Sequence, residues 1–157
     1  VTLVTWGSQV KEALEAADAL AQDGISAEVI DVATVKPLDF DTIHESVKKT
    51  GRCVIVHEAP RTAGFGAEIA AQLAEKAMFD LVAPVERVTG YDTHIPLFRL
   101  EMKFLPSVEK ILAAARRAMR VRRADSTRRI RFCSRAVSAV STSCDACRAS
   151  VIRRVSP

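Results

Sequence analysis

The chain has 157 residues and a formal net charge of +4, with 48% hydrophobic but only 5% aromatic residues. No uninterrupted apolar run approaches the roughly 18 residues that a membrane helix needs, so we expect no membrane partner. The chain begins Val-Thr-Leu-Val-Thr, with no basic stretch ahead of the apolar residues. This is unlike a secretory signal peptide and is what a fragment that starts inside a strand would show.

The positive charge belongs to the C-terminal part of the chain. Residues 121–157 hold nine Arg and two Asp, a net of +7, whereas residues 1–120 hold seven Lys and seven Arg against 17 carboxylates, a net of −3. We therefore divide the chain into a body, residues 1–120, and a basic tail of low order, residues 121–157. Such a tail can bind nucleic acid, or it can be an arbitrary C-terminus, for instance from a shifted reading frame. It contains no recognisable module, so nucleic acid is not the expected partner.

Short apolar runs alternate with amphipathic stretches along the body. Ser8, Asp39 or Asp41, and Ser107 stand where helix N-caps are expected, and Gly24 and Gly51 stand where helices end. The predicted strands cover residues 1–5, 27–32, 53–57 and 85–89; the predicted helices cover residues 9–23, 39–50, about 66–79 and 107–120. This alternation predicts a three-layer α/β/α fold with a mainly parallel sheet of at least four strands.

Polar residues follow the predicted strands, where parallel sheets place their binding sites. Gly7 and Ser8 follow the first strand, and His57 and Glu58 follow the third. One interpretation is a crevice that binds a small molecule; the other is a set of hydrogen bonds that shape the loops. Cys53 is expected to be a buried, reduced thiol. The spacing of Cys144 and Cys147 fits a redox or zinc-binding pair, but we interpret it as chance, because no second pair and no nearby His accompanies it.

A glycine pair precedes the third predicted helix, at Gly64 and Gly66. Helix N-termini can hold anions, but position 69 is Ile, so the pattern is not that of a dinucleotide loop, and Glu68 would repel a phosphate. A structural loop or a protein contact is the preferred interpretation. We find no nucleophile or metal-ligand spacing in the chain and expect no catalytic, cofactor-binding or metal-binding residue.

The loops 58–66 and 90–96 both leave the carboxyl ends of strands, so we expect them to form one surface that meets another subunit. Arg61, Thr62, Phe65, Tyr91 and Ile95 are predicted to be exposed there, a mixture typical of protein contacts. The alternative is that Phe65 turns inward as part of the core. The candidate interface or crevice residues are Gly7, Ser8, His57, Glu58, Arg61, Phe65, Glu68, Tyr91 and Asp92.

Two ordered motifs resemble a known family. HEAPRTAGFGAEIA, residues 57–70, and APVERVTGYDTHIP, residues 83–96, are similar to the C-terminal domain of the beta subunit of thiamine diphosphate-dependent 2-oxo acid dehydrogenases, a domain of the transketolase C-terminal type. The strings His-Glu-Ala-Pro and Gly-Tyr-Asp-Thr look closer to the branched-chain members than to the pyruvate members. The resemblance runs from Val1 to about Arg120 and stops before the tail.

This resemblance implies a function in a larger enzyme. In the family, thiamine diphosphate and magnesium are held between an alpha subunit and the N-terminal domain of the beta subunit, so the fragment is expected to bind neither and not to turn over substrate alone. The C-terminal domain stabilises the heterotetramer and helps to dock the dihydrolipoyl acyltransferase. The implied partners are therefore the alpha subunit, a second beta subunit and the acyltransferase, in the cytoplasm or, in a eukaryote, the mitochondrial matrix.

The resemblance also implies a strand order, with the first strand between the second and the third. A further antiparallel strand that the family places before this point is absent from the chain, so one sheet edge should be exposed or differently covered. The alternatives are a stand-alone α/β module that binds a small molecule in the crevice, and a nucleic-acid binder that acts through the tail.

Overall fold

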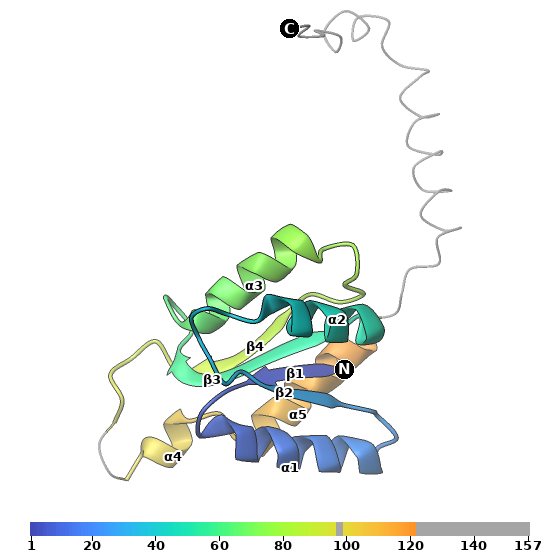
Figure 1. Cartoon of the computed structure of the whole chain (residues 1–157). Coiled ribbons are helices and arrows are strands. Elements are labelled where there is room, and N and C mark those ends of the chain that lie inside the picture. The colour runs from blue at the N-terminus through green and yellow to red at the C-terminus, as the bar shows by residue number, and fades with distance from the viewer. Residues whose placement is uncertain (97–98, 122–157) are drawn as a thin grey trace, which may run out of the picture. The chain divides into compact units, whose positions relative to one another are not determined.

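Alternating strands and helices form a four-stranded parallel sheet with helices on both faces (Figure 1). This computed structural model describes residues 1–96 and 99–121, so the predictions for the tail lie outside the described residues. The strands are β1 (Thr2–Thr5), β2 (Glu28–Asp31), β3 (Cys53–Pro60) and β4 (Glu86–Gly90); the helices are α1 (Gln9–Gln22), α2 (Phe40–Thr50), α3 (Phe65–Lys76), α4 (Glu101–Phe104) and α5 (Val108–Arg120). The predicted three-layer α/β/α fold is confirmed.

The strand order is β2-β1-β3-β4, with every neighbouring pair parallel, as the resemblance implied. In the described part of the chain, β2 and β4 are the edge strands. The registers place Thr5 of β1 opposite Asp31 of β2 and Val56 of β3. The carboxyl ends of these parallel strands therefore lie at the same end of the sheet.

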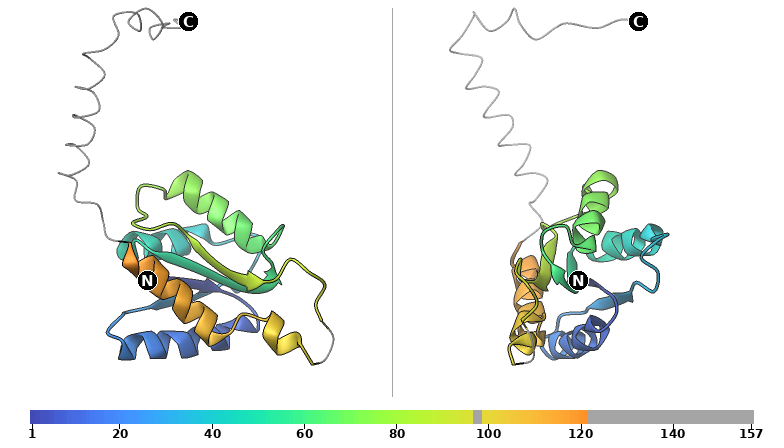
Figure 2. Two further views of the ribbon diagram at one scale, coloured as in Figure 1. Left: turned by 180° about the vertical axis from the view of Figure 1, so that it is seen from behind. Right: turned by 90° about the vertical axis from the view of Figure 1, so that its left-hand side faces the viewer.

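Two apolar clusters, one on each face of the sheet, hold the layers together. On one face, Leu3, Val54 and Val56 pack against α1 and α5; on the other, Val4 and Ile55 pack against α2 and α3 (Figure 2). Residues 53–56 are all buried because successive side chains of β3 point to opposite covered faces. Burial on both faces explains why this strand is a continuous apolar run in the sequence.

The predicted helix ends are mostly confirmed. The Asp39 carboxylate accepts a hydrogen bond from the Thr42 amide at 3.2 Å, and the Ser107 hydroxyl accepts one from the Lys110 amide at 3.4 Å. Gly51 has a φ of 67°, the left-handed conformation that favours glycine after a helix.

Three boundaries differ from the prediction. Ser8 does not cap α1, because its own backbone is already helical and its hydroxyl is directed elsewhere. Strand β3 continues to Pro60, so His57 lies within the strand and not after it. Helix α3 ends at Lys76, because Ala77 has already left the helical conformation.

Candidate functional site

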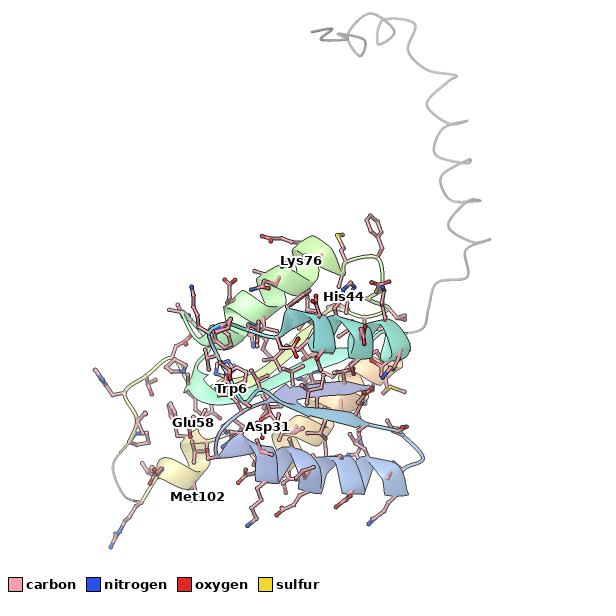
Figure 3. The ribbon with its side chains drawn as sticks, viewed as in Figure 1. Trp6, Asp31, His44, Glu58, Lys76 and Met102 are labelled. Atoms are coloured by element: carbon pink, nitrogen blue, oxygen red, sulfur yellow. The ribbon has the colours of Figure 1, made fainter. Side chains whose placement is uncertain are left out.

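The candidate site lies where β1, β3 and β4 end. Trp6, Gly7 and Ser8 follow β1, while His57 and Glu58 belong to the last half of β3. Figure 3 places Trp6 and Glu58 near each other at this edge of the sheet. The loop from Arg61 to Gly64 then leads to α3.

His57 is buried beneath the surface at this end of the sheet and is 1% exposed. The Trp6 ring stacks on the imidazole, with ring centroids 5.1 Å apart and planes 10° apart. Neither ring nitrogen has a hydrogen-bond partner among the described residues. Burial disfavours the charged imidazole, and the positive charge of Arg87 adds to this, so the pKa of His57 lies below its ordinary value.

The two glycines of the loop make room for this imidazole. A Cβ at position 64 would lie 2.7 Å from His57 Cε1, and one at position 66 would lie 2.6 Å from His57 Cδ2. Side chains do not approach one another so closely, so the ring fills the space that glycine leaves open. The glycine pair therefore holds a histidine side chain of the same chain, and the anion-binding interpretation has no structural support.

His57 is consequently a poor candidate for proton transfer. A general base must lie within hydrogen-bond reach of the proton that it removes, and here Trp6 and the loop cover the ring. The stacking of half-buried Trp6 on His57 was not anticipated from the sequence, nor was the burial of Thr5 and Gln9 at and after the end of β1. The Oγ1 of Thr5 and the Oε1 of Gln9 are also buried without a partner among the described residues.

Ser8 and Glu58 form a bridge between the ends of β1 and β3. The Ser8 hydroxyl donates to Glu58 Oε2 at 2.9 Å, and both residues are exposed. Gly7 permits the turn that leads to Ser8, because its φ is 64°. The predicted crevice residues thus lie together, but His57 is below the surface that Gly7, Ser8 and Glu58 form.

A second bridge joins the two loops that were predicted to form one surface. The Thr62 amide and the Thr62 hydroxyl donate to the two oxygens of Asp92, each at 2.8 Å. These hydrogen bonds favour the charged carboxylate, so the pKa of Asp92 lies below its ordinary value. Loops 58–66 and 90–96 are therefore in direct contact.

The remaining predicted surface residues differ in exposure. Arg61 and Thr62 are exposed, and Tyr91 and Ile95 are 56% and 60% exposed. Phe65 is not: it is half-buried and packs edge-on against Trp6, with ring centroids 5.5 Å apart. The expectation of an exposed Phe65 is therefore wrong, because the indole offers the ring an apolar partner.

Two other side chains have local structural roles. Glu68 is exposed in the first turn of α3, where its negative charge interacts favourably with the positive end of the helix dipole. It also accepts a hydrogen bond from Gln72 at 2.9 Å. His44 of α2 contacts Asp80, with 2.8 Å between Nε2 and Oδ2.

Metal-ligand clusters are not found among residues 1–96 and 99–121, where no three His, Cys, Asp or Glu side chains lie close enough to share an ion. Cys53 is a free, fully buried thiol, and burial raises its pKa to about 12. Within the same ranges, no helix has the length and apolarity to cross a membrane.

Known proteins with similar sequences carry this domain. A family model described as transketolase, C-terminal domain, matches residues 1–111. The chain is 48% identical over 116 residues to the pyruvate dehydrogenase E1 component subunit beta of Staphylococcus epidermidis, covering 74% of this chain and 36% of that protein. It is 47% identical over 121 residues to the 3-methyl-2-oxobutanoate dehydrogenase subunit beta of Mycobacterium tuberculosis, covering 76% and 35%.

A solved structure agrees with these relatives. A chain described as a split-gene transketolase in an inactive beta4 tetramer superposes with a TM-score of 0.67 and 32% sequence identity, covering 78% of this chain and 39% of that one. The present chain thus spans about a third of the length of the curated relatives, at 35–36% of each. The chain belongs to the transketolase C-terminal domain family, in the form that the beta subunits of 2-oxo acid dehydrogenase E1 components carry.

Proposed function

We propose that this chain serves the assembly of a branched-chain 2-oxo acid dehydrogenase E1 component and the docking of its dihydrolipoyl acyltransferase. Oxidative decarboxylation would require the complete enzyme, in the cytoplasm or, in a eukaryote, the mitochondrial matrix. The observation that carries the proposal is the surface formed by loops 58–66 and 90–96, which Thr62 and Asp92 join. We call it the loop surface. It exposes Arg61, Tyr91 and Ile95, a combination suited to contact with the alpha subunit or a second beta subunit.

The chemistry of the described residues favours assembly over catalysis. Trp6 covers His57, and the His57 ring fills the space beside Gly64 and Gly66, the loop that was considered as an anion site. Thiamine diphosphate with its magnesium ion therefore does not fit the described residues, and we propose that other parts of the enzyme hold both.

The branched-chain assignment rests on the strings His-Glu-Ala-Pro and Gly-Tyr-Asp-Thr. The relatives include both pyruvate and 3-methyl-2-oxobutanoate dehydrogenase subunits at nearly equal identity, 48% and 47%. The test is the ratio of kcat/KM for 3-methyl-2-oxobutanoate to that for pyruvate, measured on the complete enzyme. We expect a ratio well above one; a ratio below one overturns this assignment but leaves the assembly function intact.

The assembly function is tested by replacing Tyr91 and Ile95 with alanine in the intact beta subunit. Sedimentation velocity measures the heterotetramer formed with the alpha subunit, and a pull-down measures acyltransferase binding. We expect the double variant to weaken at least one association by about tenfold, since side chains that are buried at an interface each contribute on the order of 1 kcal/mol or more.

The matched control is Phe79→Ala. Phe79 is 98% exposed and follows α3, at the opposite end of the sheet from the loop surface. Its replacement should leave both associations unchanged. If the Tyr91/Ile95 variant folds and both associations equal those of the wild type, the loop surface is not an interface.

A further inference from the structure

A groove runs beside β4, the edge strand farthest from β2 in the described sheet. It has a volume of about 400 Å³, and its walls include successive residues of β4 and the loop after it, from Arg87 to Asp92. One face of α5 forms the opposite wall through Lys110, Ala113 and Arg117, which lie three and four positions apart. We call this the β4 groove.

Three of the four positive side chains that line the β4 groove lack a carboxylate partner among the described residues; the fourth, Arg117, pairs with Glu86. Arg61, Arg87 and Lys110 line the groove, and among the described residues none of the three forms an ion pair. Arg61 donates to the Arg87 carbonyl at 3.5 Å, and Arg87 donates to the Arg61 carbonyl at 3.3 Å. These hydrogen bonds to the backbone hold the guanidinium groups of Arg61 and Arg87 close together, and Asp92 is the one carboxylate among the described residues that line the groove.

Among the described residues, two carboxylates lie in or beside the β4 groove, fewer than its four positive side chains. Glu86 pairs with Arg117 at 2.9 Å, and both oxygens of Asp92 accept hydrogen bonds from Thr62. Lys110 donates to the carbonyls of Lys103 and Leu105 at 3.2 and 3.1 Å, which orients its ammonium group over the Tyr91 ring. The β4 groove therefore has more fixed positive charge than its own residues neutralise.

The length of the β4 groove points to an elongated ligand. Its wall on α5 runs from Lys110 to Arg117, which are two helical turns apart, about 10 Å along α5 at 1.5 Å per residue. A single phosphate or carboxylate group can reach only one of these positions, whereas an extended chain with a carboxylate at every second residue can reach several. The backbone of an edge strand also has groups that pair with an added chain.

We propose that the β4 groove binds an extended, acidic peptide segment of a partner protein, with the segment running alongside β4. The net charge of the body disfavours one other occupant. The body carries −3, so a duplex nucleic acid, which spreads negative charge over a wide area, would meet an unfavourable surface beyond the groove. This inference does not depend on the proposed function.

The test uses the full 157-residue chain and nuclear magnetic resonance, which distinguishes binding in the β4 groove from binding to the basic tail. The probe is a capped six-residue peptide of alternating valine and glutamate. Its counterpart with glutamine in place of glutamate, inorganic phosphate and a single-stranded oligonucleotide are titrated in parallel. We expect the acidic peptide to shift the amide signals of Thr89, Gly90 and Ala113, and the other three probes to leave them unchanged.

The double variant Arg61→Gln with Arg87→Gln should weaken binding at these signals about tenfold, since two charged donors are lost. The control, Lys36→Gln with Lys48→Gln, removes the same charge from two exposed positions outside the groove and should leave the affinity within about twofold. The inference is overturned if the acidic peptide shifts only tail signals, if both variants lose affinity equally, or if phosphate or the oligonucleotide produces the groove shifts instead. The unchanged spectrum of each free variant confirms that it is folded.

Discussion

Gly66 gives the sharpest test of the buried site, because its replacement by alanine places a methyl group against the His57 ring. That methyl carbon would lie 2.6 Å from His57 Cδ2 and 3.1 Å from Ile55 Cγ2. The imidazole has little room to withdraw, since it is 1% exposed and stacked on Trp6. The clash must therefore be relieved by moving packed side chains or the start of α3.

Two opposing effects set the size of the change. Overpacking of a well-filled core costs about 1–3 kcal/mol. Replacing a helical glycine with alanine gains up to about 1 kcal/mol, because alanine loses less backbone entropy on folding. Gly66 is the second residue of α3, so both effects act. Because the contact is closer than side chains adopt, the cost lies at the upper end of its range, and we expect Gly66→Ala to lower the free energy of unfolding by about 2 kcal/mol, about 3 kcal/mol of overpacking less about 1 kcal/mol of gain.

The assay is urea denaturation of a double-mutant cycle with His57→Ala. Without the imidazole the added methyl group has space, so Gly66→Ala should then be neutral or stabilising. The single variants and the double variant are measured in the full chain. Equal slopes of the unfolding free energy against urea concentration would show that all of them unfold to a comparable state. If Gly66→Ala is equally destabilising with and without the imidazole, the ring is not the reason for the glycine.

Three further predictions concern titration and reactivity. Because the pKa of His57 is lowered in the folded chain, the unfolded chain takes up the proton first as the pH falls. The free energy of unfolding therefore has its full His57 contribution above the ordinary pKa of 6.5 and loses it progressively as the pH falls below that value. The variant His57→Leu should remove this part of the pH dependence in urea melts. Asp92→Ala should accelerate hydrogen exchange of the Thr62 amide, which loses its acceptor; an unchanged exchange rate would contradict the bridge between the loops. The buried Cys53 thiol, whose pKa is raised to about 12, should resist iodoacetamide at pH 8 until denaturant is added, and peptide mass mapping would reveal any native-state labelling.

The sequence was sufficient to predict the layers and the strand alternation. Buried parallel strands are short β-branched runs, and residues 53–56 show this plainly. Helix ends were predictable where a side chain performs the capping, as at Asp39 and Ser107. Ser8 shows the limit of such rules, because a partner distant in sequence, Glu58, competes for its hydroxyl.

The buried site was less predictable, because its partners come together only in the fold. His57 was expected at a strand end, available for hydrogen bonds, but Trp6, which follows β1, stacks on it and a glycine loop packs against it. A signal was present in the sequence: a tryptophan after one strand and a histidine in the strand beside it. Recognising that signal would have required knowing the register of β1 with β3.

The proposal that this domain contributes contacts rather than chemistry can be tested by the activity of each assembled enzyme molecule. Beta subunits with wild-type sequence or with Tyr91→Ala and Ile95→Ala are mixed with the alpha subunit, and heterotetramers are separated from free subunits. The rate of CO₂ release is then divided by the amount of heterotetramer. We predict that less heterotetramer forms with the variant, while each molecule that does form releases CO₂ at the wild-type rate. Complete assembly with a large loss of activity per heterotetramer would contradict the account.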